Sequence, residues 1–128
     1  MRAKNRSFDW LRQAQDDLRF ARAAHRDRFF AQTCFICQQA SEKALKSILY
    51  FRGARTVLSH SLHKLCDELN INDELAKAAR ILDQYYISAR YPDALAEGTP
   101  SEVFTREQSE QSLEYAERFL AKATEVVK

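Results

Sequence analysis

The hydrophobic pattern has one dominant stretch, residues 29–53, which reads FFAQTCFICQQASEKALKSILYFRG. Apolar and small side chains recur there every three or four positions, as in a helix of about six turns with a broad buried face. The stripe consists of Phe30, Cys34, Cys37, Ser41, Ala44, Ile48 and Phe51, widened by Ala31, Phe35, Leu45 and Leu49. The remaining polar strip is narrow and carries Gln32, Gln39, Lys43 and Lys46. We therefore predict a central helix with packing partners on more than one side.

The same period predicts a helix before the central one, over about residues 8–25, with Ser7 as its N-cap. The connection, roughly residues 25–28, is short enough that the two helices should form an antiparallel hairpin. Gly53 fits the end of the central helix, because a residue without Cβ adopts the left-handed conformation of a helix C-terminus at little steric cost.

Two further helical segments follow the central helix. Ser59 or Ser61 can cap a short third helix, whose inward residues would be Leu62, Leu65, Cys66 and Leu69. A fourth stripe begins near residue 75 and must end near Arg90, because Pro92 disfavours helical geometry at the preceding residue. The inward positions of this fourth stripe are Leu75, Ala78, Ala79, Leu82, Tyr85 and Tyr86.

Residues 91–104 break the pattern, since they hold both prolines and one of the two glycines of the chain. We expect one long loop there, and such a loop inside a compact domain is more often functional than a plain connector. Thr105 and Gln108 then form a capping box that begins a last helix. The sequence predicts an all-α fold, an antiparallel four-helix up-and-down bundle with one additional short helix, in a single domain over residues 1–128.

Composition narrows the class of protein. Hydrophobic residues make up 45% of the chain and charged residues 30%, with only two Gly and two Pro, which excludes disorder, collagen-like repeats and a turn-rich β-sandwich. No run approaches the roughly 18 apolar residues of a membrane span, and the basic start MRAKNRSFDW lacks the apolar core of a signal peptide. We expect a cytoplasmic protein without membrane contact.

Charge is unevenly distributed along the chain. Residues 1–66 carry 13 Lys and Arg against 5 Asp and Glu, whereas residues 67–128 carry 7 against 13. The basic half could attract phosphate or RNA, since arginine suits bidentate phosphate contacts. Alternatively, the two halves could complement each other within one bundle or across a dimer.

The three cysteines and the histidines near residue 60 raise the question of a metal site. Cys34 and Cys37 share a helix face, and His60, His63 and Cys66 could complete a zinc site. The first two thiols, however, lie within an apolar helix, where cysteine acts as a small hydrophobe. We predict core cysteines, and neither a metal nor a cofactor; an odd cysteine count also agrees with a reducing compartment.

The densest polar and aromatic segment covers residues 85–93, where the predicted fourth helix meets the long loop. Arg90 can form a fork onto a phosphate or carboxylate group, and tyrosines can stack on a base. In the alternative interpretation Tyr85 is a core residue and Arg90 pairs with Asp93 or another nearby acid to hold the loop. No nucleophile elbow or glycine-rich phosphate loop is present in the sequence.

Four stretches carry a family resemblance: residues 10–18 (WLRQAQDDL), 38–46 (QQASEKALK), 60–65 (HSLHKL) and 90–93 (RYPD). With these motifs in this order, the chain resembles the HEPN domain family, in its short single-domain prokaryotic form. The resemblance implies an antiparallel four-helix bundle and usually a homodimer. It often also implies a neighbouring gene for a minimal nucleotidyltransferase, in a toxin-antitoxin-like pair.

Many similar HEPN proteins are metal-independent ribonucleases whose motif is Arg, four to six residues, then His, assembled late in the bundle across a dimer interface. This sequence departs from the motif, because Tyr-Pro-Asp follows Arg90 and no histidine occurs after His63. Arg55 and His60 satisfy the spacing, but they lie at a helix connection. The chain is therefore expected to lack strong ribonuclease activity.

Three functions are consistent with the sequence. The first is binding of a nucleotide, an RNA or a minimal nucleotidyltransferase partner through Arg90, Tyr91, Asp93, Lys43 and Lys46. The second is an RNA-cleaving toxin with a degenerate site made of Arg55 and His60. The third is a purely structural dimerisation module.

Overall fold

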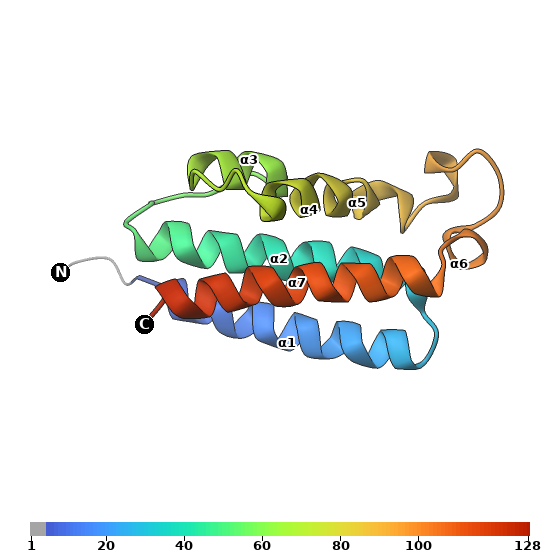
Figure 1. The fold of residues 1–128 in the computed structure, drawn as a ribbon, viewed down its shortest axis with the longest axis horizontal. Helices are drawn as coiled ribbons and strands as arrows, with labels where there is room; N and C mark the ends of the chain where they lie inside the picture. Colours follow the sequence, from blue (N-terminus) through green and yellow to red (C-terminus); the bar gives the residue numbers. More distant parts are fainter. Residues whose placement is uncertain (1–4) are drawn as a thin grey trace.

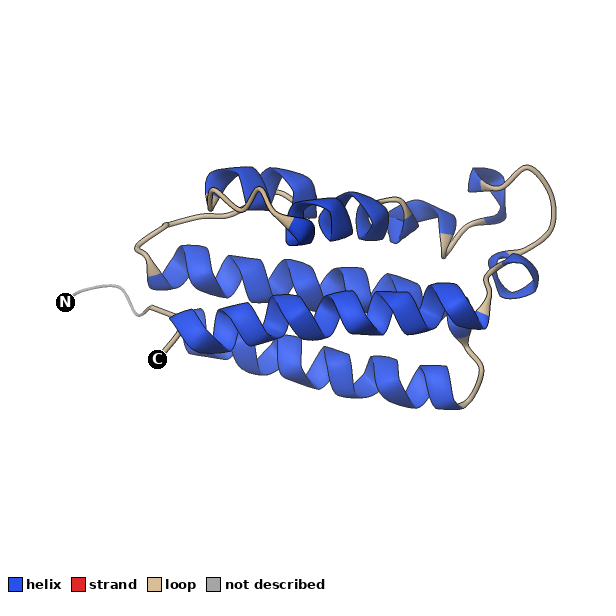
Figure 2. Ribbon diagram, in the orientation of Figure 1, coloured by secondary structure: helices blue, strands red, loops and turns tan. Residues whose placement is uncertain are grey.

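Three long helices frame the structure, a computed structural model that describes residues 5–128. They are α1 (Ser7–Arg26), α2 (Phe30–Phe51) and α7 (Arg106–Val126). Helix α7 packs against both α1 and α2 (Figure 1). The shorter elements are α3 (Leu62–Glu68), α4 (Glu74–Asp83), α5 (Tyr85–Ser88), the 3₁₀ helix η1 (Pro92–Ala94) and α6 (Pro100–Val103). No strand is present among the described residues (Figure 2).

The long helices and the α4–α5 segment alternate in direction along the bundle (Figure 1). Helices α1 and α2 form the expected hairpin, α4 and α5 run back along α2 almost in line, and α7 returns towards the end at which the chain starts. The all-α prediction and the four-helix arrangement are confirmed. The fourth helix is interrupted at Gln84, and α3 is the additional short helix.

Three helix ends have the capping residue that the sequence predicts. Ser61 Oγ accepts a hydrogen bond from the Lys64 N–H at 3.2 Å, which begins α3. Thr105 and Gln108 form the expected capping box of α7. Gly53 has a φ of +102° just beyond α2, a backbone conformation that favours glycine.

Two predicted boundaries are wrong. Helix α1 begins at Ser7 itself, so this residue is not the N-cap; instead Asn5 Oδ1 accepts a hydrogen bond from the Ser7 N–H at 2.9 Å. Residues 91–104 are not an uninterrupted loop, because they include η1 and α6. Thr99 and Glu102 form a second capping box there, which fixes the start of α6.

Helix α2 is buried along most of its length, as its broad apolar stripe predicts. The free thiols of Cys34, Cys37 and Cys66 lie in the core, which confirms their assignment as core residues. Burial raises the pKa of Cys34 to about 11 and that of Cys66 to about 12. Lys46, in contrast, was expected on the polar surface of α2 and is only 4% exposed.

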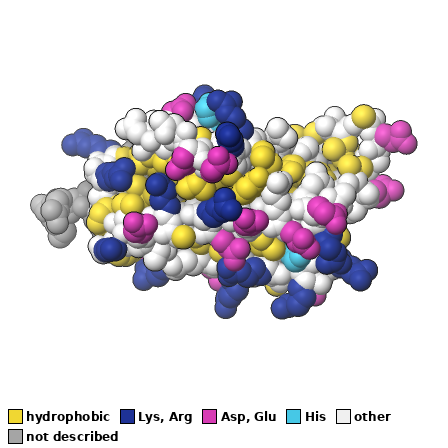
Figure 3. Space-filling model, viewed as in Figure 1, with side chains coloured by type: hydrophobic (Ala, Val, Ile, Leu, Met, Phe, Trp, Pro, Cys, Tyr) yellow, Lys and Arg dark blue, Asp and Glu magenta, His cyan; other side chains and the backbone are white. Residues whose placement is uncertain are grey.

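Opposite charges from the two halves of the chain meet within the bundle. Arg22 of α1 donates to Glu117 of α7 at 2.9 Å between Nη2 and Oε2. On the face drawn in Figure 3, basic and acidic side chains are intermixed rather than gathered by sign. The bundle therefore brings the basic half and the acidic half of the sequence together in one surface.

Candidate functional site

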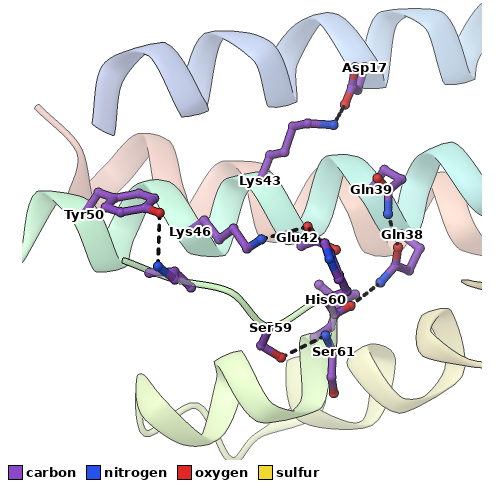
Figure 4. A network of polar contacts seen from close by, with 12 residues as sticks. Asp17, Gln38, Gln39, Glu42, Lys43, Lys46, Tyr50, Ser59, His60 and Ser61 are labelled. Carbon is purple, nitrogen blue, oxygen red and sulfur yellow. Dashed lines mark hydrogen bonds and ion pairs between the residues drawn. The ribbon is translucent and has the colours of Figure 1, made fainter. Parts of the chain in front are cut away.

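A buried ion pair lies on α2. Lys46 Nζ is 3.0 Å from Glu42 Oε2, one helical turn away, and the two side chains are 5% and 6% exposed. His60 Nδ1 lies 3.3 Å from the same carboxylate oxygen, although the His60 side chain is 62% exposed (Figure 4). Glu42 Oε1 has no hydrogen-bond partner among the described residues. Charges this deeply buried persist because each compensates the other.

The backbone at His60 is fixed by α2 and α4 together. Gln38 Nε2 donates to the His60 carbonyl oxygen at 2.9 Å, and its distance to Asp83 Oδ1 is 3.3 Å. Asp83, the last residue of α4, accepts hydrogen bonds from the Leu62 N–H at 2.9 Å and the His63 N–H at 3.0 Å. These N–H groups belong to the first turn of α3 and have no acceptor within that helix. The Asp83 carboxylate therefore links α3 to α4 and holds His60 beside α2.

An arginine and aromatic rings meet next to His60. The His60 ring stacks on Tyr86, with centroids 5.9 Å apart and an interplanar angle of 21°. The Arg90 guanidinium carbon lies 4.3 Å from the Phe35 ring centroid, 4.7 Å from that of Tyr86 and 5.1 Å from that of Tyr91. We call these five residues, Phe35, His60, Tyr86, Arg90 and Tyr91, the Arg90 cluster.

Backbone and ring contacts hold Arg90 in this position. Its Nε donates to the Tyr86 carbonyl oxygen at 2.8 Å, and no ion pair joins Arg90 to Asp93 or to any other acid within residues 5–128. The alternative in which Arg90 pins the loop through an acid is therefore wrong. Tyr85 is 8% exposed and packs on Phe104, so its assignment to the core is confirmed.

A hollow adjoins the cluster. It has a volume of about 250 Å³ and is lined by His60, Ser61, Asp83 and Tyr86. Tyr91, whose ring centroid is 5.1 Å from the guanidinium carbon, is 51% exposed. The arrangement thus offers a held guanidinium, exposed ring surface and a recess large enough for a small planar group.

The remaining residues proposed from the sequence lie outside the Arg90 cluster. Lys43 Nζ is 2.6 Å from Asp17 Oδ2 of α1, and Lys46 is held in the buried pair. Asp93 is exposed in η1, and Arg55 is exposed on the connection between α2 and α3. No hydrogen bond or ion pair in the described part of the chain joins Arg55 to His60.

Sequence reasoning missed Phe35, Glu42, Tyr86 and Asp83 as site residues. Phe35 matches an apolar stripe and is assigned to packing alone, whereas Tyr86 matches a stripe and also lies in the polar and aromatic segment of residues 85–93, but is not named as a binding residue. Glu42 and Lys46 have the i,i+4 spacing of an ordinary surface pair, so their spacing does not distinguish burial from exposure. Asp83 ends α4 and acts on α3, which no local pattern indicates.

The structure gives no support to a metal site. Within residues 5–128 no three His, Cys, Asp or Glu side chains come together in a way that could hold an ion. His63 Nε2 faces Asp67 Oδ2 at 3.7 Å instead. None of the helices formed by these residues is both long enough and apolar enough to cross a membrane.

Comparison with known proteins gives consistent matches over nearly the whole chain. A family model described as the HEPN domain matches residues 8–126. The crystal structure of TT1696 from Thermus thermophilus is 37% identical, covers 95% of this chain and 98% of its own, and superposes with a TM-score of 0.89. The crystal structure of ST0689, an archaeal HEPN homologue, is 34% identical over 98% of this chain and 100% of its own, with a TM-score of 0.84.

A relative with a functional name is also found. The protein named "Putative toxin MJ1304" of Methanocaldococcus jannaschii is 27% identical over 123 residues, which cover 87% of this chain and 81% of that protein.

Proposed function

Because the chain belongs to the HEPN domain family, we propose that it binds RNA or a nucleotide through the Arg90 cluster, as one component of a toxin-antitoxin-like module. The observation that carries this proposal is the Arg90 guanidinium held over three aromatic rings without a carboxylate partner among the described residues. The name of the archaeal relative supports the toxin-like role.

The cluster has the chemistry that a nucleotide requires. Since Nε is used by the Tyr86 carbonyl, the terminal guanidinium nitrogens of Arg90 are left to donate to phosphate oxygens, in the bidentate geometry that arginine favours. Exposed ring surface of Tyr91 and of His60 can stack on a base. Asp93, three residues beyond Arg90, could accept from a ribose hydroxyl or a base amino group.

Two further parts of the proposal rest on the family resemblance. The protein acts as a homodimer, and a minimal nucleotidyltransferase is its partner. Its cytoplasmic location is proposed from the sequence pattern instead. Lys43 and Lys46 contribute less directly than the sequence suggested, because each has a carboxylate partner of its own.

The test is binding of fluorescein-labelled single-stranded RNA, followed by anisotropy, and of ATP and GTP, followed by calorimetry. Arg90→Ala should weaken binding about tenfold or more, as expected for loss of a charge-assisted phosphate contact. Arg118→Ala is the matched control, because Arg118 is an exposed arginine paired with Glu114 on α7. If both variants are folded and bind with equal affinity, Arg90 is not part of the binding site.

A second candidate function, metal-independent RNA cleavage, is favoured by one observation: His60 and Arg90 contact the same Tyr86 ring. The Glu42 carboxylate 3.3 Å from Nδ1 can orient the imidazole so that Nε2 takes a proton from a 2′-hydroxyl. The 2′ oxygen would attack the phosphorus and displace the 5′ oxygen of the next nucleotide, which takes a proton from water, while Arg90 stabilises the phosphate transition state. This pairing differs from the one proposed from spacing, since Arg90 takes the place of Arg55.

Cleavage is tested by incubating RNA with the protein in the presence of a chelator and resolving the products on a gel. His60→Ala and Arg90→Ala should each abolish cleavage, while Arg55→Ala should leave it unchanged. Cleavage that survives His60→Ala, or RNA that stays whole with the unaltered protein, would exclude this candidate.

A further inference from the structure

A second hollow lies between α1 and α2, away from the Arg90 cluster. Its volume is about 540 Å³, and it is lined by Arg6, Asp9, Trp10, Arg12, Gln13 and Lys43. All but Lys43 come from the first two turns of α1 and the residue before it, so one short sequence segment builds most of the hollow.

The hollow carries an excess of positive charge. Arg6 and Arg12 face a single carboxylate among the lining residues, that of Asp9, whereas Lys43 is paired with Asp17 of α1 at 2.6 Å, so the excess is one positive charge. Arg6 Nε lies 2.9 Å from Asp9 Oδ2, and Arg12 pairs with the other oxygen of the same carboxylate. The Arg6 and Arg12 side chains are still 68% and 73% exposed, so both keep donors for an anion.

Trp10 supplies an apolar wall to this cationic hollow. It is half-buried and stacks with Tyr50, with ring centroids 5.5 Å apart and planes inclined by 28°. Lys46 Nζ, from the buried ion pair, lies 5.5 Å from the Trp10 ring centroid. The wall is therefore held by α2, and a phosphate with its sugar or base fits cations beside an indole better than a bare inorganic ion does.

Each of the two recognition features includes one residue of α2. Phe35 of the Arg90 cluster and Lys43 of the hollow are eight positions apart on this helix, which corresponds to about 12 Å along its axis. Gln38, Gln39 and Glu42 come between them, and Figure 4 shows this strip of α2 between Asp17 of α1 and the segment that carries His60. At the spacing of about 3.4 Å per nucleotide along one strand of a duplex, at least about four nucleotides are needed to cover this axial separation.

We infer that the hollow binds the sugar-phosphate backbone of a single-stranded RNA whose base lies on the Arg90 cluster. This inference rests on the proposed function and deepens it, because it makes the ligand an oligonucleotide of about four residues or more rather than a mononucleotide. Because the hollow and the cluster both adjoin α2, RNA is favoured over an acidic protein segment, which the same cations could also attract.

The experiment compares Arg12→Gln with Arg19→Gln. Both arginines lie on α1 and pair with an aspartate three residues earlier, but only Arg12 lines the hollow. Glutamine is nearly as good a helix former as arginine, so both variants should keep the fold. Affinity is measured by anisotropy for an RNA dinucleotide, tetramer and octamer over a series of salt concentrations.

Arg12→Gln should weaken octamer binding about threefold or more and lower the slope of log affinity against log salt by about one. Dinucleotide binding should not change, and Arg19→Gln should behave as the unaltered protein. Equal octamer affinity of the two variants, or affinity that does not increase from dinucleotide to octamer, would overturn the inference.

Two outcomes separate this inference from the proposed function. If Arg90→Ala abolishes binding while Arg12→Gln has no effect, the proposed function stands and the second contact is wrong. If Arg12→Gln leaves RNA binding intact but changes the molecular mass in solution, the hollow is an interface for a protein, and the inference is wrong.

Discussion

Replacing Lys46 by Met tests how strongly the buried ion pair contributes to stability. Methionine keeps most of the volume of the lysine stem but removes the ammonium, so the 6% exposed Glu42 side chain loses the partner at 3.0 Å. Breaking a buried pair in this way costs about 3–5 kcal/mol. The remaining contact with His60 at 3.3 Å offsets part of that loss, so we expect a decrease of about 3 kcal/mol in the free energy of unfolding.

Urea denaturation followed by circular dichroism at neutral pH measures this change. Lys77→Met is the matched control, since Lys77 pairs with Glu74 at 3.7 Å while both side chains are 77% exposed. Exposed pairs contribute about 0–1 kcal/mol, so this control should stay close to the unaltered protein. For a chain of this size, about 3 kcal/mol corresponds to roughly a 10 °C decrease in Tm.

The double variant Glu42→Gln with Lys46→Met decides whether charge is the cause. Because it removes both buried charges, it should recover at least half of the stability lost in the single variant. If Lys46→Met is no more destabilising than Lys77→Met, or if the double variant is less stable than Lys46→Met alone, the reasoning about this pair is refuted.

Two other predictions concern α3 and the core thiols. Asp83→Ala should lower the free energy of unfolding by about 2–4 kcal/mol, because it leaves the Leu62 and His63 N–H groups without their acceptor; urea denaturation checks this, and an unchanged midpoint would contradict it. The pKa of Cys34 rises from 9.0 to about 11 on burial, so the folded chain holds this proton more tightly than the unfolded chain. Stability should therefore fall as pH rises from about 9 towards 11, with a smaller fall in Cys34→Ala; equal falls in the two proteins would show that this thiol is not the cause.

The fold could be predicted because its determinants are local. The 3.6-residue period places the long helices, and Gly53 and the Thr105 capping box mark the end of α2 and the start of α7 through contacts within four residues. Ser61 marks the start of the short helix α3 in the same way. The interruption at Gln84 and the short helix α6 escaped prediction, since the backbone at Gln84 stays close to helical and the prolines of residues 91–104 indicate a loop.

The candidate site could be predicted only in part. Arg90 and Tyr91 are visible as a polar and aromatic segment, but the ring nearest to the guanidinium is that of Phe35, which lies far earlier in the chain. From spacing, His60 is a base paired with Arg55, whereas in the structure its ring stacks on Tyr86 and its Nδ1 lies 3.3 Å from Glu42 Oε2. Contacts between distant segments depend on how α2 and α5 pack, and residue spacing carries no information on that packing.

The central claim is that the Arg90 cluster binds RNA or a nucleotide, and one titration tests it most directly. Labelled single-stranded RNA is titrated with the unaltered protein, Arg90→Ala and Arg118→Ala, with helical content checked for each. We expect the unaltered protein and Arg118→Ala to bind the RNA with similar affinity, and Arg90→Ala to bind it about tenfold or more weakly. Equal affinity of all three proteins, or no binding by any of them, would contradict it.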